Sequence, residues 1–521
     1  MDPALEVFFL KRRKFKIVFK IKRVFLGLSL VIITSWSDAV EHTIQDLNFK
    51  AEKLENMLQL PQDDWLSLTL MGTKIGYAHL YAEQSEYEGE PAIRIRSEVV
   101  MEIKRTGTDL RLAMTRIAYL GMDLVPLHFV STSNETGQEK LIEGKIRNGV
   151  LEMETTLANE TTKVQTEIPP DTIFDLSISY FVSQQDIRVG NHYKLNVFSL
   201  DLLEPIGTEI RVVRQDQINQ QGRLLDVYVV DYTMDIMGGL TTTEWISQDG
   251  TTHQMETGLL GLKMKLVRTD METALGDVGE VDVILTTKIF AQGERPISGS
   301  HHLKAHLRLD SGDLEKAIVQ NQRQRMITGS DPRDGEIEVW TTELDKIQAP
   351  SLPIRTSETE PYLQSTVYIQ TDHPAIRSTA SEIVGSQNDA WIAAQKICDW
   401  VYKSITDKNL KVGFGSALQT LESLSGDCTE HTVLMIGLAR SIGIPARVCA
   451  GLVFQGDAFY YHFWPEVFVS QWIAMDPTLG QSLADATHIQ LAGSGLESDS
   501  MIEFGEGVLR TLNQLHIEIV N

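Results

Sequence analysis

The period of the hydrophobic pattern changes once along this 521-residue chain, and the change constrains the fold more than any other feature. From about Trp65 to about Lys288, apolar residues alternate with polar ones, as in "WLSLTL" and "AIRIR". This alternation is typical of strands with one buried face. Past residue 363, apolar residues recur every three or four positions, as in "DAWIAAQKICDWVYKSI", which predicts amphipathic helices. We therefore expect a multidomain protein in which an N-terminal antiparallel β-rich region precedes an α+β domain.

The front half of the chain reads as short strands separated by turns. Such a series predicts one strongly curved antiparallel sheet or a sandwich. The stretch "GKIRNGVLEMETTL" has Asn-Gly at 148–149, which predicts a hairpin turn. Three histidines follow near the end of this half, but they alternate with leucines, which favours a strand over a metal site. These histidines are His301, His302 and His306.

Composition shifts suggest where the domains begin and end. A segment with three prolines among Ser, Thr and Glu has the composition of a linker and separates the two periodic regions. We expect the following organisation: a signal peptide at 1–39, a β-rich domain of unknown role at 40–295, a small β-containing module at 296–347, the Pro-rich linker at 348–363, the α+β domain at 364–500, and a C-terminal tail or closing strand at 501–521.

The N-terminus has the order of a secretory signal. A basic run, "KRRKFKIVFKIKR", precedes the uncharged "VFLGLSLVII", and small residues follow at Ser37 and Ala39. As a helix the apolar run would be about 15 Å long, half of what a bilayer core requires. We predict export to the periplasm or the extracellular space, with membrane contact only through this segment. A tether formed by an uncleaved N-terminus is the alternative.

Charge and cysteine content narrow the function classes. The net charge is −24, so the chain repels nucleic acid and we expect no nucleic-acid partner. The three cysteines are an odd number, which leaves at least one thiol unpaired. Cys398 and Cys449 lie on apolar faces of a predicted helix and a predicted strand, so we expect buried, inert thiols there.

The remaining cysteine begins a predicted helix in "SGDCTEHTVLMIGLARSIGIPARV". Asp427 is a good N-cap, Cys428 follows as the first helical residue, and Glu430 completes a capping box. Gly443 and Pro445 mark the end. The unpaired N–H groups at a helix start favour negative charge. We therefore expect a lowered pKa for the Cys428 thiol and a place where an oxyanion is stabilised.

A base and an orienting acid follow the cysteine along the chain. His462 lies in "FYYHFWPEVFV" and Asp476 in "WIAMDPT", and the segment between them predicts a hairpin that turns near 469–471. A three-residue loop would place Trp464 opposite Asp476 and leave His462 as a diagonal neighbour on the same face, whereas a two-residue loop would turn the acid away. In that arrangement Cys428 would attack, the histidine would move the proton, and the acid would hold the imidazole.

The order "GDC-x2-H-x8-R-x2-GIPAR", "YHFWPEV" and "W-x3-DPT" closely resembles the transglutaminase-like domain of the papain-like cysteine-enzyme superfamily. The resemblance covers about residues 361–493 and implies that Cys428, His462 and Asp476 form a catalytic triad. The whole layout resembles exported bacterial proteins that are described as transglutaminase-like or as cysteine proteases.

The resemblance also leaves two expectations open. Family members usually place a side-chain donor for the oxyanion upstream of the cysteine, and here Gln419 or Ser416 could fill that place. His431 lies one helical turn from Cys428 and would either tune the thiol or pack. The chain has no acidic loop like the calcium sites of animal transglutaminases, so we expect no calcium and no other cofactor.

These observations predict an exported thiol enzyme that takes an acyl group from an amide in a protein or peptide substrate. Transfer to water, as in a cysteine peptidase or amidase, is the favoured reaction, and protein-glutamine transamidation is the alternative. A second alternative is a non-catalytic scaffold. In either case the β-rich domain could hold a cell-envelope partner. A zinc site from Cys428, His431 and His462 has suitable ligand types but an unusual spacing, so we predict no metal.

Overall fold

The computed structural model describes most of the chain after residue 59. The described residues are 41–42, 60–105, 107–135, 138–157, 160–185, 187–220, 222–236, 239–259, 262–343, 348–409, 415–496 and 507–520. The predicted signal peptide at 1–39 lies outside them. Within these ranges, none of the helices has both the length and the apolar composition that crossing a membrane requires.

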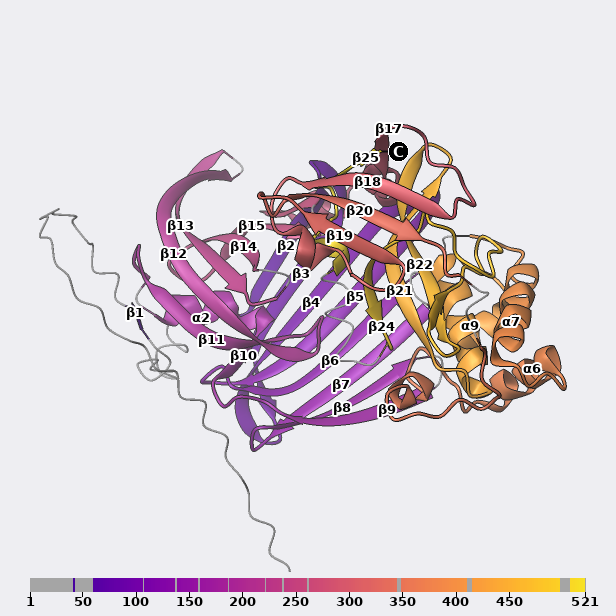
Figure 1. The fold of residues 1–521 in the computed structure, drawn as a ribbon. Coiled ribbons are helices and arrows are strands. Elements are labelled where there is room, and N and C mark those ends of the chain that lie inside the picture. Colours follow the sequence, from indigo (N-terminus) through magenta and orange to yellow (C-terminus); the bar gives the residue numbers. More distant parts are fainter. Residues whose placement is uncertain are drawn as a thin grey trace, which may run out of the picture. The chain divides into compact units, whose positions relative to one another are not determined.

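The front half forms one continuous 16-stranded sheet in which most neighbours are antiparallel (Figure 1). Its order is β1-β11-β12-β13-β14-β15-β16-β2-β3-β4-β5-β6-β7-β8-β9, and β10 pairs with β11. The strands are β1 (Glu41–His42), β2 (Gln62–Leu70), β3 (Thr73–Tyr87), β4 (Glu90–Arg105), β5 (Thr108–Gly121), β6 (Pro126–Glu135), β7 (Gln138–Arg147), β8 (Val150–Leu157), β9 (Glu160–Glu167), β10 (Thr172–Phe174), β11 (His192–Ser199), β12 (Glu204–Gln220), β13 (Arg223–Met234), β14 (Leu240–Ile246), β15 (Thr252–Leu259) and β16 (Leu262–Thr269).

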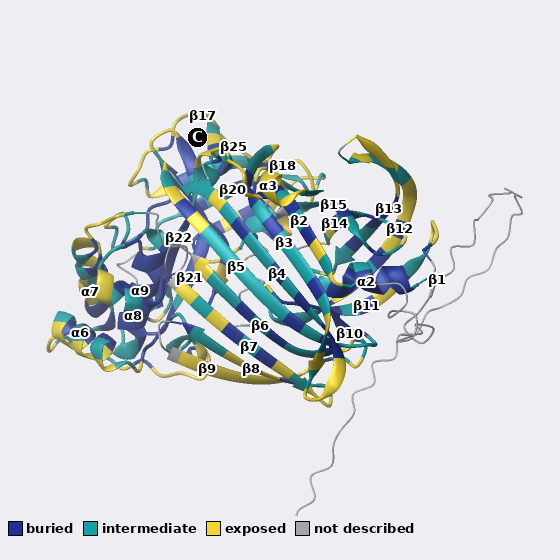
Figure 2. Cartoon of the chain, turned by 180° about the vertical axis from the view of Figure 1, so that it is seen from behind, coloured by how far each residue is buried: buried dark blue, intermediate teal, exposed yellow. Residues whose placement is uncertain are grey.

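Apolar side chains from both ends of this sheet meet in one core, so the sheet is strongly curved. Phe129 of β6, Phe174 of β10 and Phe198 of β11 lie with ring centroids 5.6–6.0 Å apart. Helix α2 (Ile178–Gln184) is buried in the same core (Figure 2). Other short helices in the described part of this region are η2 (Asp175–Ser177), α3 (Met271–Leu275) and α4 (Val283–Thr287).

The predicted alternation and hairpin are confirmed, whereas the expected strand lengths are wrong. In β2, Leu66, Leu68 and Leu70 are buried on one face. Arg147 pairs with Val150 across the turn at 148–149, whose residues have φ values of 53° and 76°, as a tight hairpin turn requires. The strands are longer than we expected, up to 17 residues in β12. The full strand length was not evident from the sequence, because several strands continue beyond their buried half into exposed polar residues.

The second sheet combines the predicted small module with the C-terminal domain. Its order is β19-β20-β18-β25-β17-β22-β21-β24, with β23 paired to β22. The small module thus shares a sheet with the domain that follows it, and β25, from the predicted tail or closing strand, lies between β18 and β17. The elements are β17 (Ile289–Gly293), β18 (His302–Leu309), α5 (Leu314–Ala317), β19 (Gln324–Thr328), β20 (Asp334–Trp340), β21 (Ala446–Gln455), β22 (Ala458–Phe468), β23 (Trp472–Ala474), β24 (Ile489–Ser494) and β25 (Leu515–Ile519).

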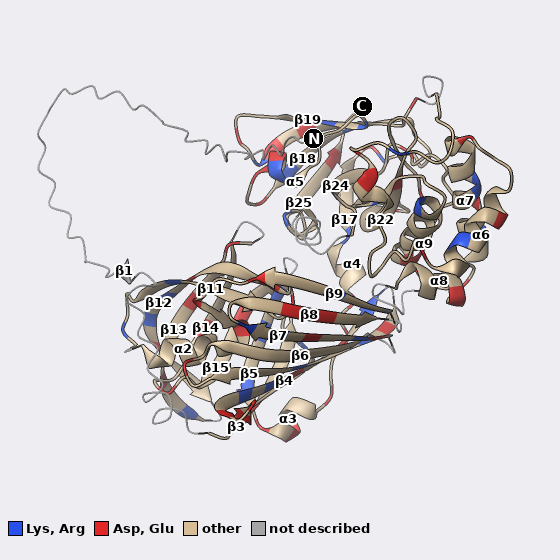
Figure 3. Cartoon of the chain, turned by 90° about the horizontal axis from the view of Figure 1, so that it is seen from below, with Lys and Arg blue, Asp and Glu red and all other residues tan. Residues whose placement is uncertain are grey.

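Among the described residues, the C-terminal domain contains the helices α6 (Pro374–Val384), α7 (Ala390–Ser404), α8 (Ala417–Ser423) and α9 (Cys428–Ser441). Helix α9 packs against β21 and β22, and 12 of its 14 residues are buried, so it is the central helix (Figure 2). Helices α6 and α7 instead carry charged residues (Figure 3). The α+β class of this domain and the β-rich class of the front half are both confirmed.

The Pro-rich segment at 348–363 lies against the C-terminal domain. The Ile354 side chain is buried in the core that α6, α7 and α9 share. Its backbone N–H donates to the carbonyl of Gly443 over 2.8 Å. Gly443 has a φ of 85°, a conformation that favours glycine, and a side chain there would meet Pro353. The segment that ends α9 is therefore fixed by the residues expected to form a linker. It ends in the 3-10 helix η4 (Glu360–Leu363).

Strand β21 has a glycine where no side chain fits, and this gives a test of the fold. A Cβ on Gly451 would lie 2.0 Å from the Ile489 carbonyl oxygen and 2.6 Å from the Trp464 ring. We expect Gly451→Ala to lower the free energy of unfolding by about 2–3 kcal/mol, because β24 or the indole must move. Chemical denaturation followed by tryptophan fluorescence measures this. Gly258→Ala is the matched strand control, since a Cβ there meets nothing within 4 Å. It should change stability by less than about 0.5 kcal/mol, and equal losses in both variants would contradict the packing argument.

Candidate active site

Helix α9 begins as its sequence predicts, with a complete capping box. The Asp427 carboxylate accepts a hydrogen bond from the Thr429 N–H over 2.8 Å, and Oε2 of Glu430 accepts one from the Asp427 N–H over 2.9 Å. Cys428 is therefore the first helical residue. Burial, together with the charge of Asp427, raises the pKa of Glu430 to about 7.

The Cys428 residue is partly exposed, but its sulfur lies in a poorly hydrated position. The sulfur accepts a hydrogen bond from the backbone N–H of Phe463, the residue after His462. Burial, assisted by the negative charge of Asp427, nevertheless raises the pKa of the thiol well above its usual value. The expectation that the helix start lowers this pKa is wrong, because desolvation of the thiolate outweighs the favourable N–H groups.

The hairpin that follows has the register the site requires. Phe468 of β22 pairs with Trp472 of β23, which leaves the three-residue loop 469–471. The Met475 N–H donates to the Pro465 carbonyl over 2.9 Å and continues this register. The three-residue loop is therefore confirmed, and the alternative two-residue loop, which would have turned the acid to the other face, is excluded.

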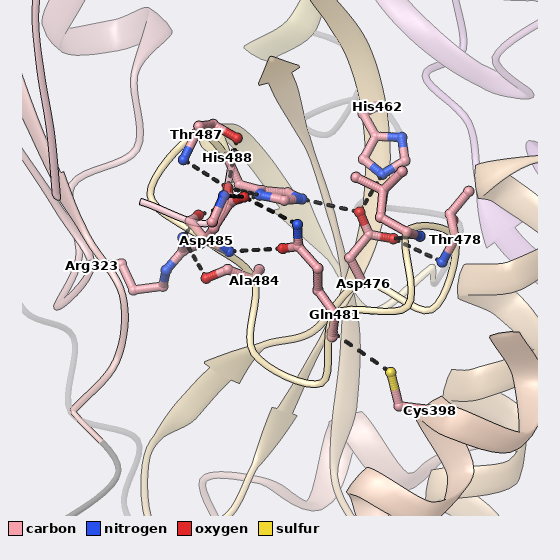
Figure 4. Close-up of polar contacts among 12 residues, drawn as sticks. Arg323, Cys398, His462, Asp476, Thr478, Gln481, Ala484, Asp485, Thr487 and His488 are labelled. Carbon is pink, nitrogen blue, oxygen red and sulfur yellow. Dashed lines mark hydrogen bonds and ion pairs between the residues drawn. The ribbon is translucent and has the colours of Figure 1, made fainter. Parts of the chain in front are cut away.

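His462 and Asp476 meet in the buried interior of the hairpin (Figure 4). The imidazole Nε2 lies 2.8 Å from Oδ2 of the carboxylate, and the two residues are 7% and 0% exposed. Oδ1 accepts hydrogen bonds from the backbone N–H groups of Thr478 (2.8 Å) and Leu479 (3.0 Å). Burial alone would raise the pKa of Asp476, but the charges and hydrogen bonds of His462 and His488 outweigh it and lower this pKa. The carboxylate is ionised.

Two residues that the sequence analysis missed extend this pair. His488 is fully buried and places its Nε2 3.0 Å from Oδ2 of Asp476, the same oxygen that His462 contacts. Its Nδ1 lies 3.1 Å from Oδ1 of Asp485 (Figure 4). Both residues lie in the loop between β23 and β24, a segment without periodicity. A local Asp-x-Thr pattern, from Asp485 to Thr487, is the one sequence signal that marks it.

The atoms of His462, Asp476 and His488 that could bind a metal ion lie within 4.8 Å of one another. The two hydrogen bonds to the Asp476 carboxylate account for this spacing without one. Cys428 does not join this cluster. The zinc set of Cys428, His431 and His462 is likewise not among the groups whose donor atoms come together in the described residues.

The two auxiliary candidates have structural partners. Gln419 is part of the capping box of α8, where its Oε1 accepts a hydrogen bond from the Ser416 N–H over 3.0 Å. Its role toward an oxyanion stays a prediction. His431 is fully buried on α9, its Nδ1 lies 2.6 Å from the Asp427 carbonyl oxygen, and burial lowers its pKa to about 4. It is therefore neutral at neutral pH, with the proton on Nδ1.

The other two cysteines are buried, as predicted. Burial raises the pKa of Cys398 to about 12 and that of Cys449 well above its usual value. All three thiols are free. Cys398 lies 3.7 Å from the Gln481 carbonyl oxygen, so it supports the loop that carries Asp476 rather than the reactive atoms (Figure 4).

Protein-family models match the front half and the C-terminal domain separately. Residues 377–477 match the family model of the transglutaminase-like superfamily, and residues 66–282 match that of a protein family of unknown function, DUF3108. The C-terminal region therefore contains a transglutaminase-like superfamily domain at residues 377–477. The resemblance inferred from the cysteine, histidine and "DPT" motifs is confirmed.

Individual relatives are distant. An uncharacterized protein of Haemophilus influenzae is 29% identical over 99 residues, which is 18% of this chain and 27% of that protein, so the chain matches about a quarter of its length. A candidate cysteine protease from Cytophaga hutchinsonii has a TM-score of 0.30 at 14% identity, covering 45% of this chain and 87% of its own. A β-barrel-like protein of unknown function (DUF1849) from Brucella abortus has a TM-score of 0.33 at 13% identity, covering 40% and 96%. TM-scores this low do not bear on function.

The raised pKa of Cys428 predicts how the thiol reacts in the absence of substrate. Because the thiolate is disfavoured, iodoacetamide should alkylate Cys428 more slowly at pH 7 than it alkylates free cysteine, and the rate should rise above pH 9. Mass spectrometry of the Cys428 peptide across pH measures this. Rapid alkylation that persists down to pH 5 would instead show a stable thiolate.

Glu430 gives a separate pH prediction. Its pKa rises from 4.5 to about 7 on folding, so the ionised form is disfavoured in the folded state. This contribution to stability is present below pH 4.5 and is lost as pH rises through about 7. Glu430→Gln removes the titration and keeps an acceptor for the Asp427 N–H. The stability of the variant relative to the wild type should increase between these pH values and then level off. A difference that is constant with pH would contradict it.

Proposed function

We propose that this protein is a thiol enzyme in which Cys428, His462 and Asp476 act as a catalytic triad for acyl transfer from an amide. The observation that carries the proposal is the 2.8 Å contact between His462 and Asp476, formed beside the Phe463 N–H group that meets the Cys428 sulfur. Membership of the transglutaminase-like superfamily supports it.

The first half of the reaction acylates the cysteine. His462 uses Nε2 for Asp476, so Nδ1 is the nitrogen left to take the proton of the Cys428 thiol. The sulfur then attacks the amide carbonyl carbon, and the N–H groups at the start of α9 stabilise the resulting oxyanion. When the C–N bond breaks, His462 returns its proton to the leaving amine and a thioester remains. Because the pKa of Cys428 is raised, the thiol keeps its proton until the sulfur attacks, and His462 takes that proton during the attack.

The second half releases the acyl group. His462 takes a proton from the acceptor, the acceptor attacks the thioester carbonyl, and the Cys428 sulfur leaves and is reprotonated. Asp476 stays ionised throughout and stabilises the imidazolium through its contact with Nε2. The favoured acceptor is water, which gives a peptidase or amidase that acts on proteins or peptides. The alternative acceptor is an amine, which gives a transamidase.

Other parts of the proposal concern the protein's surroundings. We propose that the protein is exported, since the segment at 1–39 has the order of a secretory signal, and that its β-rich domain holds a cell-envelope partner. The competing function is a non-catalytic scaffold, which requires neither a reactive thiol nor a base beside it.

An activated ester tests the chemistry without knowledge of the natural substrate. With p-nitrophenyl acetate, the wild type should release nitrophenol and carry an acetyl group on Cys428, seen by mass spectrometry. Cys428→Ala should lower turnover by at least about 10³-fold, and His462→Ala by a similar factor. Cys398→Ala, which removes a thiol outside the proposed triad, should retain turnover.

Adding cadaverine to the same reaction separates the two acceptors. Release of acetate in its presence supports hydrolysis, whereas Cys428-dependent formation of acetyl-cadaverine supports transamidation. Turnover that survives Cys428→Ala would reject the thiol enzyme and leave the scaffold.

A further inference from the structure

His488 lies between two buried carboxylates on the far side of Asp476 from His462. Its Nε2 is 3.0 Å from Asp476 and its Nδ1 is 3.1 Å from Asp485 (Figure 4). All three side chains are at most 5% exposed. A neutral imidazole has one N–H group and can donate to one of these carboxylates only. The second contact therefore needs a further proton, either on a carboxylate or on the other ring nitrogen of His488.

The hydrogen bonds around Asp476 and Asp485 indicate that both carboxylates are ionised. Asp476 accepts from two backbone N–H groups at Oδ1. Oδ1 of Asp485 accepts from the Thr487 N–H (2.9 Å) and hydroxyl (2.6 Å), and its Oδ2 accepts from the Gly299 N–H (2.7 Å) and the Gln481 amide (3.1 Å). The oxygens of both acids are surrounded by donors, as carboxylates prefer. Both ring nitrogens of His488 must then donate.

The charges around His488 agree with that protonation state. Asp476 and Asp485 would place two negative charges in a buried region, and an imidazolium at His488 cancels one of them. Arg323, also buried, donates to the Asp485 backbone carbonyl over 2.8 Å rather than to the carboxylate. Nδ1 of His488 also lies 3.3 Å from the Asp485 backbone carbonyl oxygen, and its ring lies 5.2 Å from the neutral Trp464 ring and 6.1 Å from the His462 ring. Lys408 contributes positive charge toward Asp476 from a more exposed position.

We propose that His488 is a positioning residue of this site: as a buried imidazolium bound to Asp476 and Asp485, it fixes the Asp476 carboxylate and sets the charge that His462 experiences. The inference rests on the proposed function, because it assigns His488 to the reaction of Cys428. His488 acts through Asp476 and does not touch the reacting atoms.

The proposal has a specific consequence for His462. When His462 is neutral, as the proposed reaction requires, the group of Asp476, Asp485, His488 and His462 carries one net negative charge, and it becomes neutral when His462 accepts the thiol proton. Without the imidazolium, two negative charges would favour a protonated His462 at rest, and a protonated base cannot accept the thiol proton. His488 therefore keeps His462 available as a base toward lower pH.

The loop that carries His488 is anchored by the small module, which explains how a loop residue can be placed accurately. Arg323, which precedes β19, holds the backbone of Asp485, and the Gly299 N–H holds its carboxylate. The Ala486 N–H donates to the Ser300 carbonyl over 2.9 Å. The module thus supports the far end of the proposed chain of hydrogen bonds.

Nuclear magnetic resonance tests the charge directly. The full chain carrying Cys428→Ala is labelled with [15N]histidine and dialysed against a chelator, so that no metal ion can occupy the ring nitrogens, and His488 is assigned by comparison with a variant that also carries His488→Gln. Both His488 nitrogens should stay protonated at pH 7 and above. An unprotonated nitrogen at pH 7 would overturn the proposal, and this result does not depend on catalysis.

The pH profile of Cys428 acetylation tests the effect on the reaction. His488→Gln keeps a donor toward Asp476 but removes the charge, and it should lower acetylation at least about tenfold at pH 6 and move the acid limb of kcat/KM upward by about one pH unit. The double variant His488→Gln with Asp485→Asn restores the net charge, so its acid limb should return toward the wild-type position. Thr487→Val is the control, because it removes the hydroxyl bond to Asp485 without a change of charge, and its acid limb should not move.

The outcomes separate this proposal from the one it rests on. If the wild type never becomes acetylated, the proposed function fails, whereas the resonance experiment still decides the state of His488. A wild-type acid limb and wild-type rate in His488→Gln would reject the positioning role. A loss of rate without a shifted limb in this variant would also reject it, since a structural role alone explains that result.

Discussion

The candidate site depends on the hydrogen bonds that the buried Asp476 carboxylate accepts. It is fully buried and accepts four hydrogen bonds, two from backbone N–H groups and two from imidazoles. A buried charge is tolerated when such partners replace its hydration. The backbone donors come from Thr478 and Leu479, directly after it, so the turn that ends the hairpin and the charge that orients His462 depend on each other. Changing either one would disturb both.

Two separate structural features position the three residues of the proposed triad. The hairpin register brings Asp476 to the face that carries His462, and the capped start of α9 places Cys428 against the next residue of that strand. Because α9 is buried on nearly all sides, its position is fixed by packing rather than by the polar contacts of the site. The residues of the proposed triad are therefore held by the core, as the proposed chemistry requires.

Local signals made much of this predictable. The alternation in the front half, the capping box and the three-residue loop are written in neighbouring residues, and each is confirmed. The thiol pKa was not predictable in the same way, since the helix start is visible in the sequence whereas burial of the sulfur is a property of the tertiary structure. His488 was missed for a related reason: its importance comes from contacts across a loop, to Asp476 and Asp485, and no repeat or spacing marks them. The predicted strand lengths were too short because the exposed polar halves of the strands resemble turns in the sequence.

The place of β25 in the second sheet affects the order in which the protein can fold. This strand, formed by residues 515–519, lies between β18 and β17, which come from residues more than 200 positions earlier. In the front sheet most neighbouring strands are consecutive in sequence, so they can pair as the ribosome releases them. The connection between β17 and β18 must wait until β25 has been synthesised. On the ribosome, much of the front sheet can therefore pair before the two parts of the second sheet become joined, so the small module reaches its final place late.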